Sequence, residues 1–261
     1  MTALRSLPDL PSPGERIDVR CVGVRYRLAR ERVSTLKEFA IRWLRSSLTY
    51  ESFWALRGVS FRIGPGERVA IVGRNGAGKS TLLRVLAGIL PPTEGSAVVG
   101  GGVTPVLGLN AGFHRELTGI ENVYLNALLL GRSRREVEAA LDDIVAFSEL
   151  GDFIHSPLRS YSSGMMARLG FAVATAWIPE VLLLDEVFAV GDAGFLEKCQ
   201  ERLRRFHRQG TTVILVTHNV AAVKRTCTRC LWLERGRLVA DDSAEAVLRS
   251  YWRSLVEGGR P

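Results

Sequence analysis

The chain has 261 residues, of which 46% are hydrophobic, so it can bury one large core or two smaller ones. It carries 35 basic and 27 acidic residues, and its formal net charge is +8. This charge permits nucleic acid or an anionic membrane surface as a neighbour and says nothing about the fold. The longest apolar runs are strand-sized, so we expect no membrane-spanning helix.

The first 15 residues combine several prolines with short apolar runs, which predicts a flexible arm of a cytoplasmic protein rather than a secretory signal. The run RIDVRCVGVRYRL then alternates apolar and polar residues up to Tyr26, as a half-buried strand does. A second such run, FWALRGVSFRIG, starts at Phe53. The two runs predict an antiparallel sheet that flanks the core of the domain.

An insertion from Leu28 to Ser52 separates these two runs. It predicts a helix with one apolar face, formed by Leu36, Phe39, Ala40, Trp43 and Leu44. The basic residues of the insertion are Arg30, Arg32, Lys37, Arg42 and Arg45. Two interpretations stay open: a surface helix packed on its own domain, or a contact with a membrane subunit or with lipid headgroups.

The stretch IVGRNGAGKST, from Ile71 to Thr81, fills the phosphate-loop pattern G-x-x-x-x-G-K-[ST] at every position. The apolar run ERVAIV predicts a strand before it, and TLLRVLAGIL predicts a helix after it. Glycines let the backbone N–H groups approach a β-phosphate. Lys79 is expected to reach the β- and γ-phosphate oxygens, and the Ser80 hydroxyl is placed to bind Mg²⁺.

After a turn-rich stretch with short strands, the pattern becomes helical and predicts a helical subdomain over about residues 112–166. Ser133 and Glu136 form a capping-box signature within it. The subdomain ends at Ser162, Ser163 and Gly164, just ahead of an apolar helix. A hydroxyl-rich helix start of this kind could hold a second anion.

The run Val181 to Leu184 predicts a buried strand that ends at two carboxylates, Asp185 and Glu186. Next to a phosphate loop, the first carboxylate is expected to hold Mg²⁺ and the second to orient or deprotonate the attacking water. The strand TTVILVTH brings His218 to the sheet edge where open α/β sheets bind ligands, which favours a γ-phosphate contact.

The end of the chain predicts a hairpin followed by an amphipathic helix, WLERGRLVADDSAEAVLRSYWRSL. Just before it, Cys227 and Cys230 form a lone C-x-x-C pattern. Because no second cysteine pair or histidine cluster accompanies them, we interpret both as ordinary core or surface thiols rather than a metal or redox site.

Taken in order, these features resemble the ATP-binding subunit of an ABC transporter over about residues 17–255. The resemblance implies an α/β phosphate-loop NTPase with a RecA-like core, an antiparallel β subdomain and a helical subdomain. The implied organisation is an arm over residues 1–15, an ABC ATPase domain over 16–255 and a tail over 256–261.

The resemblance also implies a role for each matching residue, with ATP and Mg²⁺ as cofactors. The expected catalytic residues are Glu186 and His218, and the expected metal ligands are Ser80 and Asp185. Tyr26 corresponds to the aromatic residue that stacks on adenine and Asp192 to the aspartate of the D-loop. The remaining expected nucleotide-binding residues are Gly73, Arg74, Asn75, Gly76, Ala77, Gly78, Lys79, Thr81, Ser162, Ser163 and Gly164.

The residues found at two motifs resemble one group within this family. Tyr161 to Met165 read YSSGM where the commonest family signature is LSGGQ, and DEVFAVGD stands for the usual DE-x-x-x-x-L-D. With the segment GFHRELTGIENV and the insertion before FWAL, both are similar to the ATPases of O-antigen, capsule and teichoic-acid exporters. In the Q-loop the family has a glutamine, and here Asn110 or Leu109 stands at that place.

The implied function is a peripheral ATPase subunit at the cytoplasmic face of the inner membrane, driving export of a lipid-linked polysaccharide or a teichoic-acid-like glycan. Its implied partners are a polytopic membrane permease and a second copy of the chain, with ATP sandwiched in the homodimer. The alternative is a soluble ABC ATPase acting on nucleic acid or ribosomes. Nucleic acid is disfavoured because the arginines are spread along the chain and neither a second cassette nor a long coiled coil is present.

Overall fold

The computed structural model describes residues 11, 14–29, 50–108, 112–186 and 193–257. The strands are β1 (Ile17–Ala29), β2 (Tyr50–Ile63), β3 (Arg68–Val72), β4 (Glu94–Val99), β5 (Val103–Val106), β6 (Val181–Asp185), β7 (Thr212–Val216), β8 (Arg229–Glu234) and β9 (Arg237–Ser243). The helices are α2 (Lys79–Leu86), α3 (Gly119–Leu129), α4 (Arg134–Ser148), α5 (Ser163–Ala174), α6 (Ala193–Arg208), α7 (Val220–Thr226) and α8 (Ala244–Glu257), with 3₁₀ turns η1 (Gly151–His155) and η2 (Leu158–Ser160).

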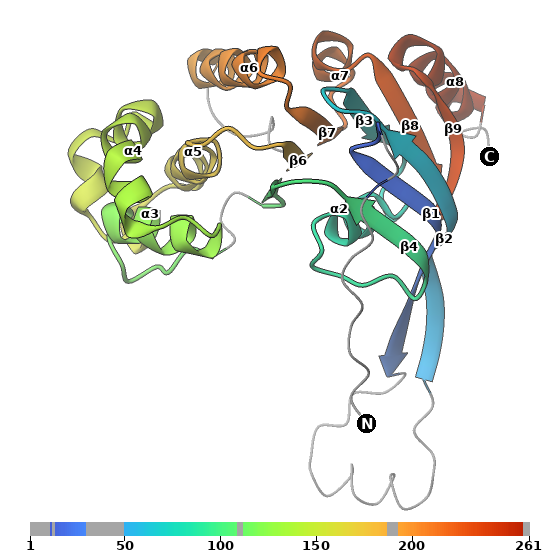
Figure 1. The fold of residues 1–261 in the computed structure, drawn as a ribbon, viewed down its shortest axis with the longest axis horizontal. Helices are drawn as coiled ribbons and strands as arrows, with labels where there is room; N and C mark the ends of the chain where they lie inside the picture. The colour runs from blue at the N-terminus through green and yellow to red at the C-terminus, as the bar shows by residue number, and fades with distance from the viewer. Residues whose placement is uncertain (1–10, 12–13, 30–49, 109–111, 187–192, 258–261) are drawn as a thin grey trace, which may run out of the picture.

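A six-stranded sheet forms the centre of the fold, in the order β5-β6-β7-β3-β8-β9. Strand β3 pairs in parallel with β7 and β8, and only the hairpin partner β9 runs antiparallel. Alternate residues of the central strands face opposite layers, so Ile71 packs toward α2 while Ala70 and Val72 pack toward α6, α7 and α8 (Figure 1). Because both faces are covered, the central strands are apolar in their middle residues and polar only at their ends.

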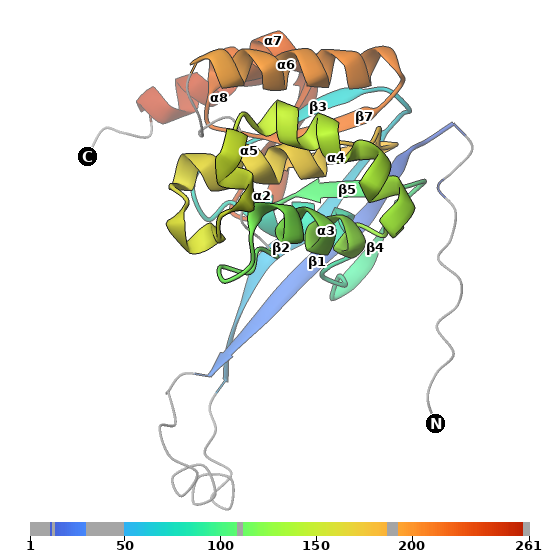
Figure 2. The same cartoon turned by 90° about the vertical axis from the view of Figure 1, so that its left-hand side faces the viewer.

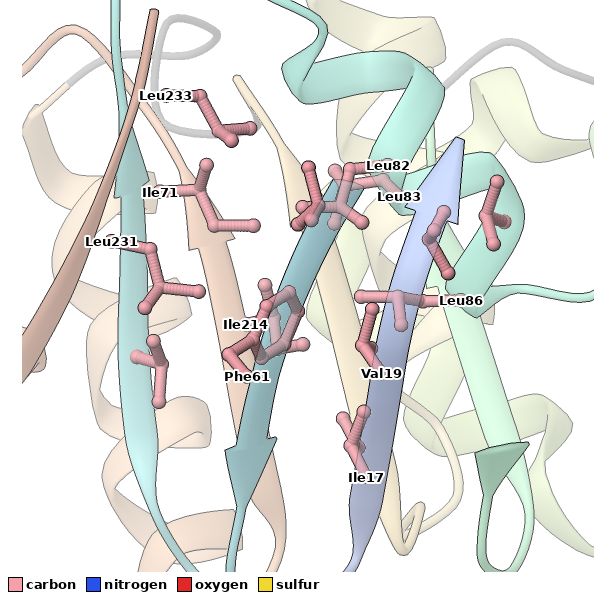
Figure 3. Packing of buried hydrophobic residues seen from close by; sticks show 14 of the residues in the cluster. Ile17, Val19, Phe61, Ile71, Leu82, Leu83, Leu86, Ile214, Leu231 and Leu233 are labelled. Atoms are coloured by element: carbon pink, nitrogen blue, oxygen red, sulfur yellow. The ribbon is translucent and has the colours of Figure 1, made fainter. Parts of the chain in front are cut away.

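A second sheet, in the order β2-β1-β4, is antiparallel as predicted. Figure 3 shows its inner face, with Val19 and Phe61, closing over Ile214 of the larger sheet. Strands β1 and β2 are longer than predicted, because residues 28–29 and 50–52 of the supposed insertion are paired strand. The predicted helix within that insertion, with Trp43 on its apolar face, lies outside the described residues.

The helices α3, α4 and α5 form a layer at one end of the molecule, on the far side from the small sheet (Figures 1 and 2). The capping box at Ser133 and Glu136 is confirmed, and a second one starts α3 at Thr118. Helix α5 shares the core of this layer through Leu169, so the helical region continues past residue 166. None of the described helices has both the length and the apolar character of a membrane span.

Cys227 and Cys230 are buried, free thiols. Burial raises the pKa of each thiol to about 12, because an apolar environment disfavours the thiolate. Metal ligation and redox exchange both require the thiolate. The interpretation of these two cysteines as structural thiols therefore agrees with their surroundings.

We predict that Gly119→Ala destabilises the protein. A Cβ at this first residue of α3 would lie 2.7 Å from the Ile154 carbonyl oxygen and against the Tyr161 hydroxyl. Overpacking of this kind costs about 1–3 kcal/mol, which should lower the thermal midpoint by roughly 3–10 °C. Gly102→Ala is the control, because its Cβ would meet no atom within 4 Å. Equal midpoints for the two variants would contradict the packing described here.

Candidate functional site

The phosphate loop joins the end of β3 to the start of α2 and is held by backbone from two directions. Gly78 has φ 104°, and a Cβ there would lie 2.6 Å from the Ala55 carbonyl oxygen of β2. A Cβ on Gly73 would collide with the Leu233 carbonyl oxygen of β8. These glycines are thus required by the approach of the protein's own backbone, in addition to the predicted approach of a phosphate.

Lys79 is the first residue of α2 and is only 7% exposed. Its Nζ donates to the carbonyl oxygens of Gly73, at 2.8 Å, and Arg74, at 3.1 Å. Burial lowers the pKa of this ammonium, while the negative charges of Glu186 and Asp185 act in the opposite direction. The structure therefore places the one buried cation of the loop beside the two carboxylates predicted to act with it.

Three side chains meet at the carboxyl edge of the sheet. Asp185 ends β6 opposite Val216 of β7, and the Glu186 N–H donates to the Val216 carbonyl oxygen at 2.9 Å. His218 follows β7 rather than ending it, and its Nε2 lies 3.0 Å from Oε1 of Glu186. Glu186 has φ 53°, a left-handed conformation that is uncommon outside glycine and recurs at functional sites.

Lys79 and Glu186 line a pocket of about 500 Å³, whereas Asp185 and His218 are not among its lining residues. Its lining includes the phosphate loop from Asn75 to Thr81, with Ser80, and Glu186. Tyr26 also lines the pocket, and its contact with a nucleotide base stays a prediction. The pocket thus joins the predicted phosphate-binding and base-binding ends within one described cavity.

Sequence reasoning missed four residues of this pocket, namely Phe53, Trp54, Ala55 and Arg235. Phe53 is the cross-strand partner of Tyr26, and their ring centroids lie 5.6 Å apart. Phe53 is 48% exposed, whereas Tyr26 is partly buried against the core. The only available signal was that Phe53 opens the second alternating run, and the long insertion concealed its pairing with Tyr26.

The predicted signature residues lie apart from this pocket. Ser162 is the N-cap of α5, and its hydroxyl accepts from the Met165 N–H at 3.2 Å. Ser163 and Gly164 lie within the first turn rather than ahead of the helix, which corrects the predicted boundary. None of the three lines the pocket beside Lys79. Asp192 and the Q-loop position at Leu109 and Asn110 lie outside the described residues.

A family model described as ABC transporter matches residues 56–189, a segment that contains the phosphate loop, Ser162 and both carboxylates. The O-antigen export system ATP-binding protein RfbB of Klebsiella pneumoniae is 48% identical over 78% of this chain and 83% of its own length. RfbB of Myxococcus xanthus is 46% identical over 81% of this chain and 49% of its own length. The teichoic acids export ATP-binding protein TagH of Levilactobacillus brevis is 37% identical over 90% of this chain and 64% of its own length.

Solved structures show the same fold at lower sequence identity. The ATP-binding cassette MJ0796, in a dimeric post-hydrolysis state with ADP and Pi, matches with a TM-score of 0.71 and 22% identity, over 87% of this chain and 98% of that one. An ATP-binding subunit of an ABC transporter matches with a TM-score of 0.71 and 22% identity, over 90% of this chain and 93% of that one.

We predict that Phe53→Ala weakens nucleotide binding, because an exposed aromatic ring at the mouth of the pocket offers a face on which a base can stack. Stacking is worth about 1–3 kcal/mol per base, so Kd for ATP should rise at least about fivefold in a fluorescence titration. Phe153→Ala is the matched control, since Phe153 is 57% exposed on η1 and does not line the pocket. Unchanged affinity in Phe53→Ala would remove this residue from the base site.

Proposed function

The chain belongs to the ABC transporter family and is an ATPase of the ABC type, and from this premise we propose that it drives export of a lipid-linked polysaccharide or a teichoic-acid-like glycan. For hydrolysis the main observation is that Glu186, a carboxylate able to act as the base, lies beside the phosphate loop with His218 Nε2 at 3.0 Å. The nature of the cargo is supported by the O-antigen and teichoic-acid export systems named for its relatives.

Lys79, Glu186 and His218 each have a separate role in the proposed hydrolysis. In this proposal, the Lys79 ammonium leaves the loop carbonyls and offsets charge on the β- and γ-phosphates. A water oxygen attacks the γ-phosphorus, Glu186 accepts its proton, and the bond to the β-γ bridging oxygen breaks to give ADP and phosphate. His218, fixed beside Glu186, contacts the γ-phosphate oxygens.

The residues expected to hold Mg²⁺ carry suitable donors, and Ser80 is the one of the two that lines the pocket beside Lys79. Ser80 and Asp185 offer the hard oxygen donors that Mg²⁺ prefers, and the Asp185 carboxylate accepts no hydrogen bond from any residue that the structure describes. Mg²⁺ is commonly held by one or two protein ligands together with substrate phosphates. When bound, the ion would neutralise charge on the phosphate oxygens.

A second copy of the chain completes the proposed site. Ser162 sits at the start of α5 and outside its own chain's pocket, with the helix N–H groups and macrodipole available to an anion. We therefore propose that Ser162, Ser163 and Gly164 contact the γ-phosphate of a nucleotide on a partner copy in a head-to-tail homodimer.

A groove of about 290 Å³ between the helical layer and the core is the proposed docking site of the membrane permease. Its lining is predominantly apolar, and Ile89 and Leu129 stand 61% and 68% exposed at it. Such a groove suits an amphipathic helix. Because the relatives are ATP-binding proteins of export systems, the occupant we propose is a cytoplasmic helix of the permease, which holds the chain at the cytoplasmic face of the membrane.

We predict that Glu186→Gln retains ATP but hydrolyses it at least about 100-fold more slowly, since the amide cannot accept the water's proton. Lys79→Ala should instead lose both binding and turnover, because it removes the cation that holds the phosphates. Steady-state ATPase assays with parallel ATP titrations separate the two variants. Wild-type turnover in Glu186→Gln would exclude Glu186 as the base.

The same variant tests the homodimer. Glu186→Gln should dimerise when ATP is added and dissociate when it is removed, as measured by light scattering. Ser162→Arg introduced into it should block the dimer, because the longer side chain would occupy the phosphate's place. A dimer that forms without ATP, or that ignores the arginine, would contradict the assignment of Ser162.

We predict that Leu129→Glu weakens association with the permease, because it places a charge in the apolar groove. Leu128→Glu is the matched control: Leu128 is the adjacent residue of α3, is 53% exposed and does not line the groove. Each variant is co-expressed with the membrane permease of its export system, and the amount that co-purifies is compared. The thermal midpoint and the basal ATPase rate of both purified subunits should stay at wild-type values. Equal retention of the two variants would place the permease elsewhere.

A further inference from the structure

A separate pocket of about 190 Å³ lies at the opposite edge of the sheet from the phosphate loop. It is bounded by α6, α7 and the first residues of β3 and β7, and Figure 1 shows both helices over this face of the sheet. Its polar lining consists of Arg68, Gln200, Arg204, His207, Arg225 and Thr226. Nothing in the hydrolytic site described above uses these side chains.

The lining carries three arginines and no carboxylate. Arg204 is paired with Glu201 at 2.8 Å, and Glu201 also accepts from Arg208. Arg68 and Arg225 form no ion pair or hydrogen bond through their side chains with any described residue. Among the described residues, the pocket therefore holds two arginine charges, those of Arg68 and Arg225, without an acidic partner.

His207 adds a second and independent feature. Its Nδ1 is buried and has no hydrogen-bond partner among the described residues. Burial, and then the charge of Arg68, lower the pKa of this imidazole, so its cationic form is disfavoured. A buried polar atom without a partner is uncommon in proteins, and a bound ligand is one of the ordinary reasons for it.

We propose that this pocket binds a small oxyanion, in the form of a phosphate group held by Arg68 and Arg225 with His207 as a further donor. Planar guanidinium groups bind phosphate through paired N–H···O bonds, and a neutral or charged imidazole can donate to the same oxygens. The proposal does not depend on the exported cargo. The competing explanation is that Arg225 and His207 only stabilise the C-terminal ends of α7 and α6.

Histidine NMR on the full chain tests this, because the sequence contains only four histidines. The ring resonances of His207 and His218, assigned from His207→Gln and His218→Gln spectra, report the new pocket and the phosphate loop separately in one sample. Inorganic phosphate should shift the His207 resonance saturably, and sodium chloride at equal ionic strength should not. A parallel titration with glycerol phosphate shows whether a free phosphate or a phosphomonoester is the better occupant.

Arg225→Gln should raise Kd for phosphate at His207 by about tenfold, the loss expected for a charge-assisted hydrogen bond. Lys224→Gln is the matched control, because Lys224 is the preceding residue of α7, is exposed and does not line the pocket. It should change Kd by less than about twofold, and thermal midpoints confirm that both variants fold. The proposal is overturned by an unsaturable His207 shift, by an equal response to chloride, or by equal weakening in the two variants.

Discussion

The close approach of three backbone segments at the phosphate loop is the constraint on which the rest of the structure depends. Gly78 lies against Ala55 of β2, and Gly73 lies against Leu233 of β8. The Gly236 N–H of the β8–β9 turn donates to the Ala77 carbonyl oxygen at 3.0 Å, and the Gly236 carbonyl accepts from Arg57 at 2.8 Å. The loop therefore receives its shape from both sheets before any ligand arrives, so a nucleotide meets preorganised N–H donors.

These backbone contacts at the phosphate loop make the small antiparallel sheet part of the nucleotide site. The segment that supports Gly78 is continuous with Phe53, and Phe53 pairs with Tyr26 across the strands. Phosphate and base contacts are thus connected through one strand, β2. A shift of β2 that spoiled the base contact would also disturb the backbone contact that fixes the loop.

The sequence was sufficient for the parts of the site that are local in the chain. The phosphate loop, Asp185, Glu186 and His218 each end or follow a buried strand, and parallel strands bring such ends to one edge. Contacts between residues far apart in the chain could not be predicted from the sequence. Phe53 lacked a visible partner because of the insertion, and the basic pocket joins Arg68, His207 and Arg225 from three separate elements. The domain limits at residues 16 and 255 and the roles of the site residues remain predictions.

Helix α6 is linked to both sites that the proposed ATPase cycle uses, namely the hydrolytic site at Glu186 and the helix start at Ser162. It is the next described element after Glu186, and it packs on the helical layer that carries Ser162. Arg202 of α6 lies 3.8 Å from the ring centroid of Phe147 in α4 and pairs with Asp143 at 2.9 Å. Because packed aromatic and charged contacts have discrete arrangements, a displacement of the helical layer relative to α6 would strain or exchange them. Nucleotide-dependent movement of the helical layer would therefore be resisted at α6, the helix whose C-terminal end also lines the basic pocket.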